Sequence, residues 1–280
     1  PFIDTVTAVE AVAREVGIPV HMSVCTDGQL SAKERNWLCE KMHRIDVSLD
    51  GSPDIQNRQR PRKDGCDSFV QPAALIREAN AAGREVYIRT TVTEATVQHM
   101  TYFVDYFAEM FGKRVSIVFN AMTQLGNMQE GCSAPAPAFF VENFGYALDR
   151  ACAIGVNVVH PVISVDTLLV DPYAAIDRMV CLLPNQMIAR HSEPYWLKDA
   201  ANNSSSVFGC VNRLNQRLNI DEDAFRNSIE GVFPQHCRSC VCVGACVSHP
   251  SSWGWNASHP GDRDCSIHTG LTMEVLKRLV

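Results

Sequence analysis

Between residues 19 and 119 the chain alternates strand-like and helix-like segments, and this alternation limits the possible folds more than any other feature of the sequence. The strand-like segments are short apolar runs at residues 19–25, 45–49, 85–92 and 115–119. The segments between them have apolar residues at helical spacing, at residues 31–42, 69–82 and 96–111. Such alternation with short connections is typical of parallel strands joined by right-handed crossovers. The sequence therefore predicts an α/β fold, either a barrel or an open doubly wound sheet.

The ends of the predicted helices carry capping residues. Ser31 and Glu34 stand at the spacing of a capping box, in which each side chain binds the other residue's backbone N–H. Gly83 and Gly112 follow the second and third helices, where glycine commonly ends a helix. Beyond residue 131 the pattern is less regular, with helices predicted at 139–154 and 173–183, a strand at 156–165 and a linker at 200–206.

Polar side chains follow or end each of the four predicted strands. In parallel α/β folds, ligands bind beyond the carboxyl ends of the strands. A lone polar residue there is commonly a turn or cap residue, but Arg89 lies within a strand, where an unpaired buried guanidinium would cost on the order of several kcal/mol. Arg89 must therefore face a solvated cavity or a carboxylate. The candidate residues at the strand ends are Thr26, Asp27, Ser48, Asp50, Arg89, Thr91 and Asn120.

Charge and hydropathy exclude two classes of partner. The 280 residues carry 25 basic and 31 acidic side chains without a block of Lys or Arg, so no surface for nucleic acid is indicated. The apolar runs stop well short of the ~20 residues that cross a bilayer. The chain also opens without the charged and apolar regions of a secretory signal. We therefore expect a cytoplasmic protein that binds neither nucleic acid nor membranes.

The cysteines are concentrated near the carboxyl end of the chain. Of 12 cysteines, Cys237, Cys240, Cys242, Cys246 and Cys265 all fall in the last 44 residues, and Cys210 precedes them. In a reducing compartment, close cysteine spacing indicates metal or cluster ligation rather than disulfides. Four thiolates suit zinc and iron–sulfur clusters alike, so the spacing leaves the identity of the metal open.

Residues 48–60, SLDGSPDIQNRQR, resemble the segment that follows the fourth barrel strand of radical S-adenosylmethionine enzymes with a SPASM domain. Around it, Pro1 resembles the last residue of the family's Gly-Gly-Glu-Pro motif, residues 25–28 resemble its Thr-Asn-Gly turn, and residues 88–93 resemble its fifth strand. The resemblance implies a partial (β/α)6 barrel over residues 1–130, a barrel end and connector over 131–205, and a small Cys-rich, SPASM-like domain over 206–280.

The tail resembles the SPASM core but departs from it in detail. Cys237, Cys240 and Cys246 reproduce the core spacing Cys-x2-Cys-x5-Cys, whereas Pro250 stands near the position of the family's next cysteine. Cys265 would then complete the ligand set of one auxiliary [4Fe-4S] cluster. Cys242 is an additional thiol, and Cys210 is what remains of the upstream auxiliary-cluster cysteines. The printed chain also has no Cys-x3-Cys-x2-Cys motif; if Pro1 ends the Gly-Gly-Glu-Pro motif, that motif would precede residue 1.

The resemblance implies a peptide or protein maturase. In the family, a second [4Fe-4S] cluster on the missing motif binds S-adenosylmethionine and reduces it, and the 5'-deoxyadenosyl radical then takes hydrogen from a substrate side chain, leading to oxidation or a cross-link. A precursor peptide or protein, with sulfatase-type maturation as one variant, and an electron donor such as flavodoxin or ferredoxin are the implied partners. By position, the residues implied for S-adenosylmethionine are Ser48, Asp50, Arg89, Asn120 and Thr26.

Two other interpretations remain open at this point. The first is a non-catalytic module with a cluster or zinc tail that recognises a peptide or pairs with a chain carrying the three-cysteine motif. The second is an unrelated α/β enzyme with a structural zinc ribbon, in which Ser48 and Asp50 are turn residues.

Overall fold

The computed structural model describes residues 2–122, 132–160, 181–182, 187–189, 207–212, 217–225 and 263–279. The chain divides into two compact units. The first unit contains residues 1–136 and 146–159, and the second contains residues 137–145 and 160–280. The boundary between these units therefore falls within one helix, and the domain division expected from the sequence stays a prediction.

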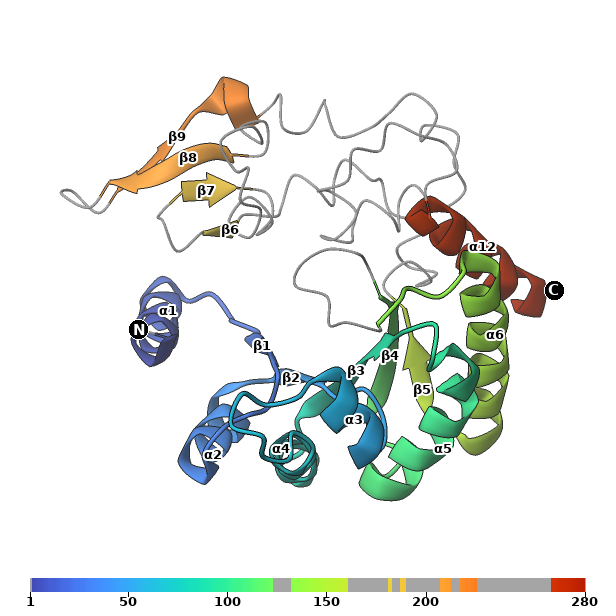
Figure 1. The fold of residues 1–280 in the computed structure, drawn as a ribbon. Helices are drawn as coiled ribbons and strands as arrows, with labels where there is room; N and C mark the ends of the chain where they lie inside the picture. The colour runs from blue at the N-terminus through green and yellow to red at the C-terminus, as the bar shows by residue number, and fades with distance from the viewer. Residues whose placement is uncertain are drawn as a thin grey trace. The chain divides into compact units, whose positions relative to one another are not determined.

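The first unit is built on a parallel sheet of five strands, whose spatial order equals their order in the sequence. All neighbouring strands pair in parallel, and the helices that connect successive strands lie on one side of the sheet (Figure 1). Sequential order with crossovers of one hand produces this arrangement, which is that of a barrel rather than of a doubly wound sheet. The strands are β1 (Ser23–Thr26), β2 (Arg44–Ser48), β3 (Glu85–Val92), β4 (Ser116–Ala121) and β5 (Asn157–Val159).

The helices of this unit confirm most of the sequence pattern. The capping box of Ser31 and Glu34 is present in both directions at the start of α2, and Gly83 and Gly112 have positive φ angles of 71° and 82° behind their helices. A short 3-10 turn η1 (Val97–His99) precedes α5. The helices are α1 (Phe2–Val16), α2 (Ala32–Lys41), α3 (Pro53–Gln59), α4 (Val70–Ala81), α5 (Met100–Phe111) and α6 (Pro137–Ile154).

The hydrophobic core lies between the sheet and these helices. Alternate residues along β2, β3 and β4 point toward the helices and are fully buried, among them Ile45, Ile88 and Phe119. Phe103 and Phe107 of α5 are buried equally completely. Each such side chain stabilises the fold by roughly 1.5–3 kcal/mol. The opposite residues of the same strands are therefore the ones left for a ligand.

Two helices of the first unit were not predicted from the sequence. α3 begins with Pro53 directly after Ser52, but it contains a lone apolar residue, Ile55, so its periodicity carries no signal. α1 does have apolar residues at helical spacing, including Val6, which is buried, and Val9. Among the described helices, none is long and apolar enough to cross a bilayer.

The second unit contains an antiparallel sheet and a terminal helix. Its strands β6 (Cys181–Leu182), β7 (Met187–Ala189), β8 (Val207–Asn212) and β9 (Arg217–Ile220) follow one another in space. The helix predicted at 173–183 is wrong at Cys181 and Leu182, which pair with β7. Its remaining residues, the linker at 200–206 and the strand residues 161–165 lie outside the described residues.

The terminal helix α12 (Arg263–Leu279) packs against the first half of α6. A Cβ atom at Gly270 would lie 2.8 Å from Val141 Cγ2, so the close approach of the two helices depends on glycine at this position. Two histidine rings lie in the same unit, with His160 and His268 at a centroid distance of 6.0 Å. Burial lowers the pKa of His268 to about 4.

Candidate functional site

The register of the parallel sheet brings four of the predicted residues together. Ser48 of β2 is paired with Arg89 of β3, and two residues further along β3 Thr91 is paired with Asn120 of β4. Because paired residues, and residues two apart, share a face of a sheet, these four side chains stand on the face opposite the helices. All four are partly exposed. The carboxyl ends of three neighbouring strands therefore present hydroxyl, guanidinium and amide groups side by side.

Thr26 is placed differently. It is paired with Val47, which is fully buried on the helix side of the sheet. Its hydroxyl accepts a hydrogen bond from the backbone N–H of Gly28 at 3.0 Å and so closes the turn after β1. The structure gives Thr26 this local role, and its contact with a nucleoside stays a prediction.

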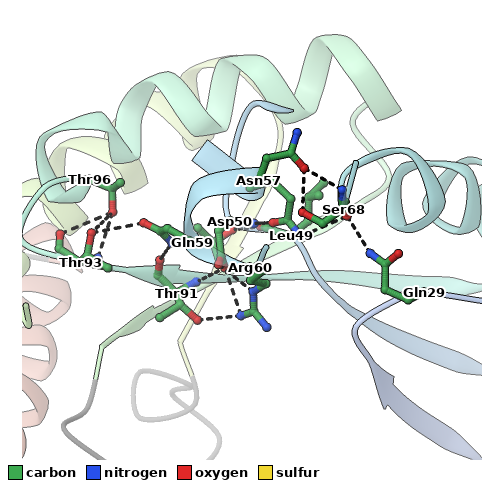
Figure 2. A network of polar contacts seen from close by, with 12 residues as sticks. Gln29, Leu49, Asp50, Asn57, Gln59, Arg60, Ser68, Thr91, Thr93 and Thr96 are labelled. Carbon is green, nitrogen blue, oxygen red and sulfur yellow. Dashed lines mark hydrogen bonds and ion pairs between the residues drawn. The ribbon is translucent and has the colours of Figure 1, made fainter. Parts of the chain in front are cut away.

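Asp50 is a buried support for the loop that follows β2. Its side chain is 2% exposed, and its carboxylate accepts hydrogen bonds from Arg60 Nε at 2.7 Å and from Arg60 Nη2 at 3.2 Å. The backbone N–H of Thr91 donates to the same carboxylate at 2.8 Å. Asp50 therefore joins the end of α3 to β3, as Figure 2 shows. Its direct contact with S-adenosylmethionine stays a prediction.

Arg60, which was not predicted from the sequence as a site residue, lies at the centre of this network. Besides pairing with Asp50, its Nη2 donates to the hydroxyl of Thr91 at 3.0 Å (Figure 2). A signal was available, because a buried carboxylate needs a cation and Arg60 closes the 48–60 segment that contains Asp50. The need of a buried carboxylate for a cation does not distinguish Arg60 from the neighbouring Arg58 and Arg62. Helix α3, which orients these arginines, was not predicted.

Two glutamines of α3 extend the network to either side. The side-chain oxygen of Gln56 accepts a hydrogen bond from the backbone N–H of Asp50 at 2.8 Å. The side-chain nitrogen of Gln59 donates one to the backbone oxygen of Thr91 at 3.1 Å. Thr93 then donates to Gln59 at 3.3 Å. Every turn of this short helix is thus tied to a strand end by hydrogen bonds rather than by apolar packing, which fixes a polar segment that has little core of its own.

The second arm of the network reaches the loop before α4. The backbone N–H and hydroxyl of Ser68 both donate to Asn57 Oδ1, at 2.7 and 2.8 Å. Gln29, in the turn after β1, donates to the backbone oxygen of Ser68 at 2.8 Å (Figure 2). The turns that follow the first two strands are therefore held in one hydrogen-bonded assembly.

Arg89 projects from the polar face of the sheet, as the sequence required. Its Nη1 lies 3.4 Å from the sulfur of Cys25, which is exposed on β1, across the intervening strand β2. Nearer the start of the strands, the Arg44 guanidinium lies 3.7 Å from the centroid of the Tyr87 ring and 2.6 Å from Asp46. The pairing with Asp46 raises the pKa of Arg44. The face opposite the helices is thus polar along its length.

The predicted cluster ligands are described only in part. Cys210 lies on β8 and Cys265 on α12, both partly exposed and both free thiols. Cys237, Cys240, Cys242 and Cys246 lie outside the described residues. Within the described part of the chain, no group of three or more His, Cys, Asp or Glu side chains is arranged to hold a metal ion. The auxiliary cluster stays a prediction.

Comparisons with known proteins identify the fold. No family model and no curated protein matches the chain. Among solved structures, native anSMEcpe with bound AdoMet has a TM-score of 0.65 at 14% identity, over 99% of this chain and 79% of that one. The structure of the same enzyme with AdoMet and the Kp18Cys peptide has a TM-score of 0.67 at 15% identity, over 99% and 80% of the two chains.

A second enzyme shares the fold over a smaller part of its length. The structure of Streptococcus suis SuiB bound to S-adenosylmethionine has a TM-score of 0.52 at 13% identity, over 84% of this chain and 56% of that one. Both neighbours are radical S-adenosylmethionine maturases of peptides or proteins that carry SPASM domains. The present chain therefore has the fold of radical S-adenosylmethionine maturases with a SPASM domain, as its sequence predicted.

Proposed function

We propose that this chain forms part of a radical S-adenosylmethionine enzyme that oxidises or cross-links a side chain of a peptide or protein. The observation that carries the proposal is the strand register, which aligns Ser48 with Arg89 and Thr91 with Asn120 at the carboxyl end of a parallel sheet. Ligands of parallel α/β folds bind at this edge.

The groups at this edge fit S-adenosylmethionine by their chemistry. A guanidinium binds a carboxylate through charge-assisted hydrogen bonds, and Arg89 is the cation among the four aligned side chains. The hydroxyl of Ser48 and the amide of Asn120 can both donate to and accept from ribose and adenine. We therefore assign Arg89 to the methionyl carboxylate, Ser48 to the ribose and Asn120 to the adenine.

The remaining network would hold these groups in place. Asp50 and Arg60 fix the end of α3 against Thr91, so the edge is held rigid before a ligand arrives. When bound and reduced, S-adenosylmethionine would supply the radical chemistry that removes hydrogen from the substrate. The chain's own residues would orient it and exclude water.

We further assign an auxiliary [4Fe-4S] cluster to Cys237, Cys240 and Cys246 with Cys265, and keep Cys210 and Cys242 as additional candidate ligands. A peptide or protein substrate is supported by anSMEcpe, whose structure holds a peptide beside AdoMet. A flavodoxin or ferredoxin as electron donor completes the proposal.

The test is reductive cleavage of S-adenosylmethionine by the product of the whole gene, reconstituted anaerobically with iron and sulfide and reduced with dithionite. We expect 5'-deoxyadenosine, and no product without reductant. The 280-residue chain by itself, which has no Cys-x3-Cys-x2-Cys motif, should bind S-adenosylmethionine without cleaving it. A whole-gene product that binds iron but forms no 5'-deoxyadenosine would contradict the proposal and favour the non-catalytic module.

A further inference from the structure

A cavity of about 480 Å³ lies beside the polar network, between the turn that follows β1 and the loop that follows α3. Its size falls in the range of ligand pockets in proteins. Its lining includes Asp27, Gln29, Arg60, Arg62, Lys63 and Asp64, three cations against two carboxylates.

The two carboxylates of the lining are already engaged. Asp64 accepts from Arg62 Nε at 3.0 Å and from Arg62 Nη2 at 2.6 Å, and it also accepts from the backbone N–H of Cys66. These bonds from Arg62 hold the pKa of Asp64 well below its usual range. Asp27 accepts the backbone N–H of Gln29 at 3.1 Å. Both carboxylates of the lining therefore already accept hydrogen bonds from residues of the same two loops.

The groups left unengaged are donors. Arg60 uses Nε and Nη2 toward Asp50 and Thr91, while none of the described residues accepts a hydrogen bond from its Nη1. Likewise, within the part of the chain that the structure describes, Lys63 makes no hydrogen bond or ion pair, and it is exposed at the rim. The cavity thus offers two positively charged donors that no described residue engages.

The position of Arg60 makes it a prepared binding group rather than a mobile surface arginine. Asp50, at 2% exposure, holds two of its nitrogens, while a third of the Arg60 side chain remains exposed. A guanidinium fixed in this way gives up little rotamer freedom when a ligand binds.

From these observations we propose that the cavity binds a carboxylate, supplied by an acidic residue of the substrate peptide, through Arg60 Nη1 and Lys63. The inference rests on the proposed function for the identity of the ligand, since a peptide substrate brings the carboxylate. An acidic side chain seated here would fix the peptide beside the carboxyl edge of the sheet, and so would determine which neighbouring residue of the peptide reaches that edge.

The test compares two model peptides, acetyl-Gly-Gly-Glu-Gly-Gly-amide and its Gln counterpart, carrying the same fluorophore, by fluorescence anisotropy with the full chain. We expect the Glu peptide to bind about fivefold more tightly or better, since one charge pair is gained. Lys63→Gln should reduce this preference, because Arg60 alone then faces the carboxylate, and Lys63→Arg should retain it. Arg58→Gln is the matched control: it removes one exposed positive charge from α3 away from the cavity and should leave the preference unchanged.

Several outcomes would overturn the inference. Equal binding of the two peptides by the unmodified chain, or an undiminished preference in folded Lys63→Gln, removes the cavity from substrate recognition. S-adenosylmethionine affinity is measured in parallel, and a loss of that affinity in Lys63→Gln would mean that the carboxylate of S-adenosylmethionine is the occupant instead. Neither readout requires radical chemistry, so a preference for the Glu peptide, together with a whole-gene product that forms no 5'-deoxyadenosine, would refute the proposed function alone.

Discussion

Asp50 and Arg60, ten residues apart, form a bidentate ion pair whose carboxylate is almost completely buried, with distances of 2.7 and 3.2 Å between the paired atoms. The pair links the loop after β2 to the end of α3, and the backbone of Thr91 completes it from β3. A carboxylate this deeply buried is tolerated because both of its oxygens accept hydrogen bonds, from Arg60 and from the backbone of Thr91.

Removing one partner of this pair should destabilise the first unit. Asp50→Asn leaves Arg60 without its counter-charge, and because Arg60 is partly exposed we expect a loss near the lower end of the roughly 3–5 kcal/mol found for broken buried pairs. The free energy of unfolding from denaturant titration measures it. Glu109→Gln, an exposed carboxylate on α5, should change that free energy by less than about 0.5 kcal/mol. Equal stability of the two variants would show that the pair contributes nothing.

Arg89→Ala should weaken the binding of S-adenosylmethionine by about 10- to 100-fold, the equivalent of one charge-assisted hydrogen bond. The unfolding midpoint should barely move, because Arg89 lies on the polar face and leaves the core intact. Equilibrium dialysis with the labelled cofactor on the whole-gene product provides the measurement, with Lys113→Ala, an exposed cation behind α5, as control. An unchanged dissociation constant would take Arg89 out of the site.

Cys237→Ala or Cys240→Ala should remove iron from the tail. We expect about four iron and four sulfide per chain in the reconstituted 280-residue protein, and a large loss of both in either variant, because cluster binding and folding of such a module are coupled. Cys152→Ala, an exposed thiol on α6, should keep the full content. Zinc in place of iron in the unmodified chain would instead support the ribbon interpretation.

Acid should weaken the second unit through His268. Burial lowers the pKa of this histidine to about 4, below its value of about 6.5 in an unfolded chain. Between those two values the unfolded chain binds a proton that the folded chain does not, so stability is lost as pH falls from 6.5 toward 4, by on the order of 3 kcal/mol at most.

The measurement is the free energy of unfolding at pH 7 and at pH 4.5. His268→Leu should show a smaller difference between the two pH values than the unmodified chain does. His99→Gln, which replaces an exposed histidine, should keep the full difference. If all three proteins lose the same stability on acidification, His268 is not responsible for any of it.

The strands of the parallel sheet and most of the helices with an apolar stripe could be predicted from the sequence, because burial on one face leaves a periodic record. β3 was predicted with its observed bounds, Glu85–Val92, since alternate residues of it are buried. α3 leaves no such record: its position depends on hydrogen bonds from Gln56, Gln59 and Arg60 to strands that are distant in the sequence.

The same distinction applies to the candidate site. Ser48 and Asn120 could be proposed because they stand near strand ends, and Arg89 because a guanidinium within a strand needs a solvated cavity or a carboxylate. The parallel register then brought the three together. Thr26 could not be separated from them by sequence, since its turn hydrogen bond to Gly28 depends on backbone geometry. Arg60 required knowledge of which arginine faces Asp50, and that is a property of the folded loop.

The alternation of buried and partly exposed residues along β3 gives this strand two independent sets of constraints. Ile88 and Thr90 are fully buried, and the Thr90 hydroxyl donates to the backbone oxygen of Leu49 at 2.8 Å. Arg89 and Thr91 alternate with them on the other face. Substitutions at odd-numbered positions can therefore diversify ligand preference while even-numbered positions preserve the scaffold, so the strand can acquire new specificity without first losing its stability.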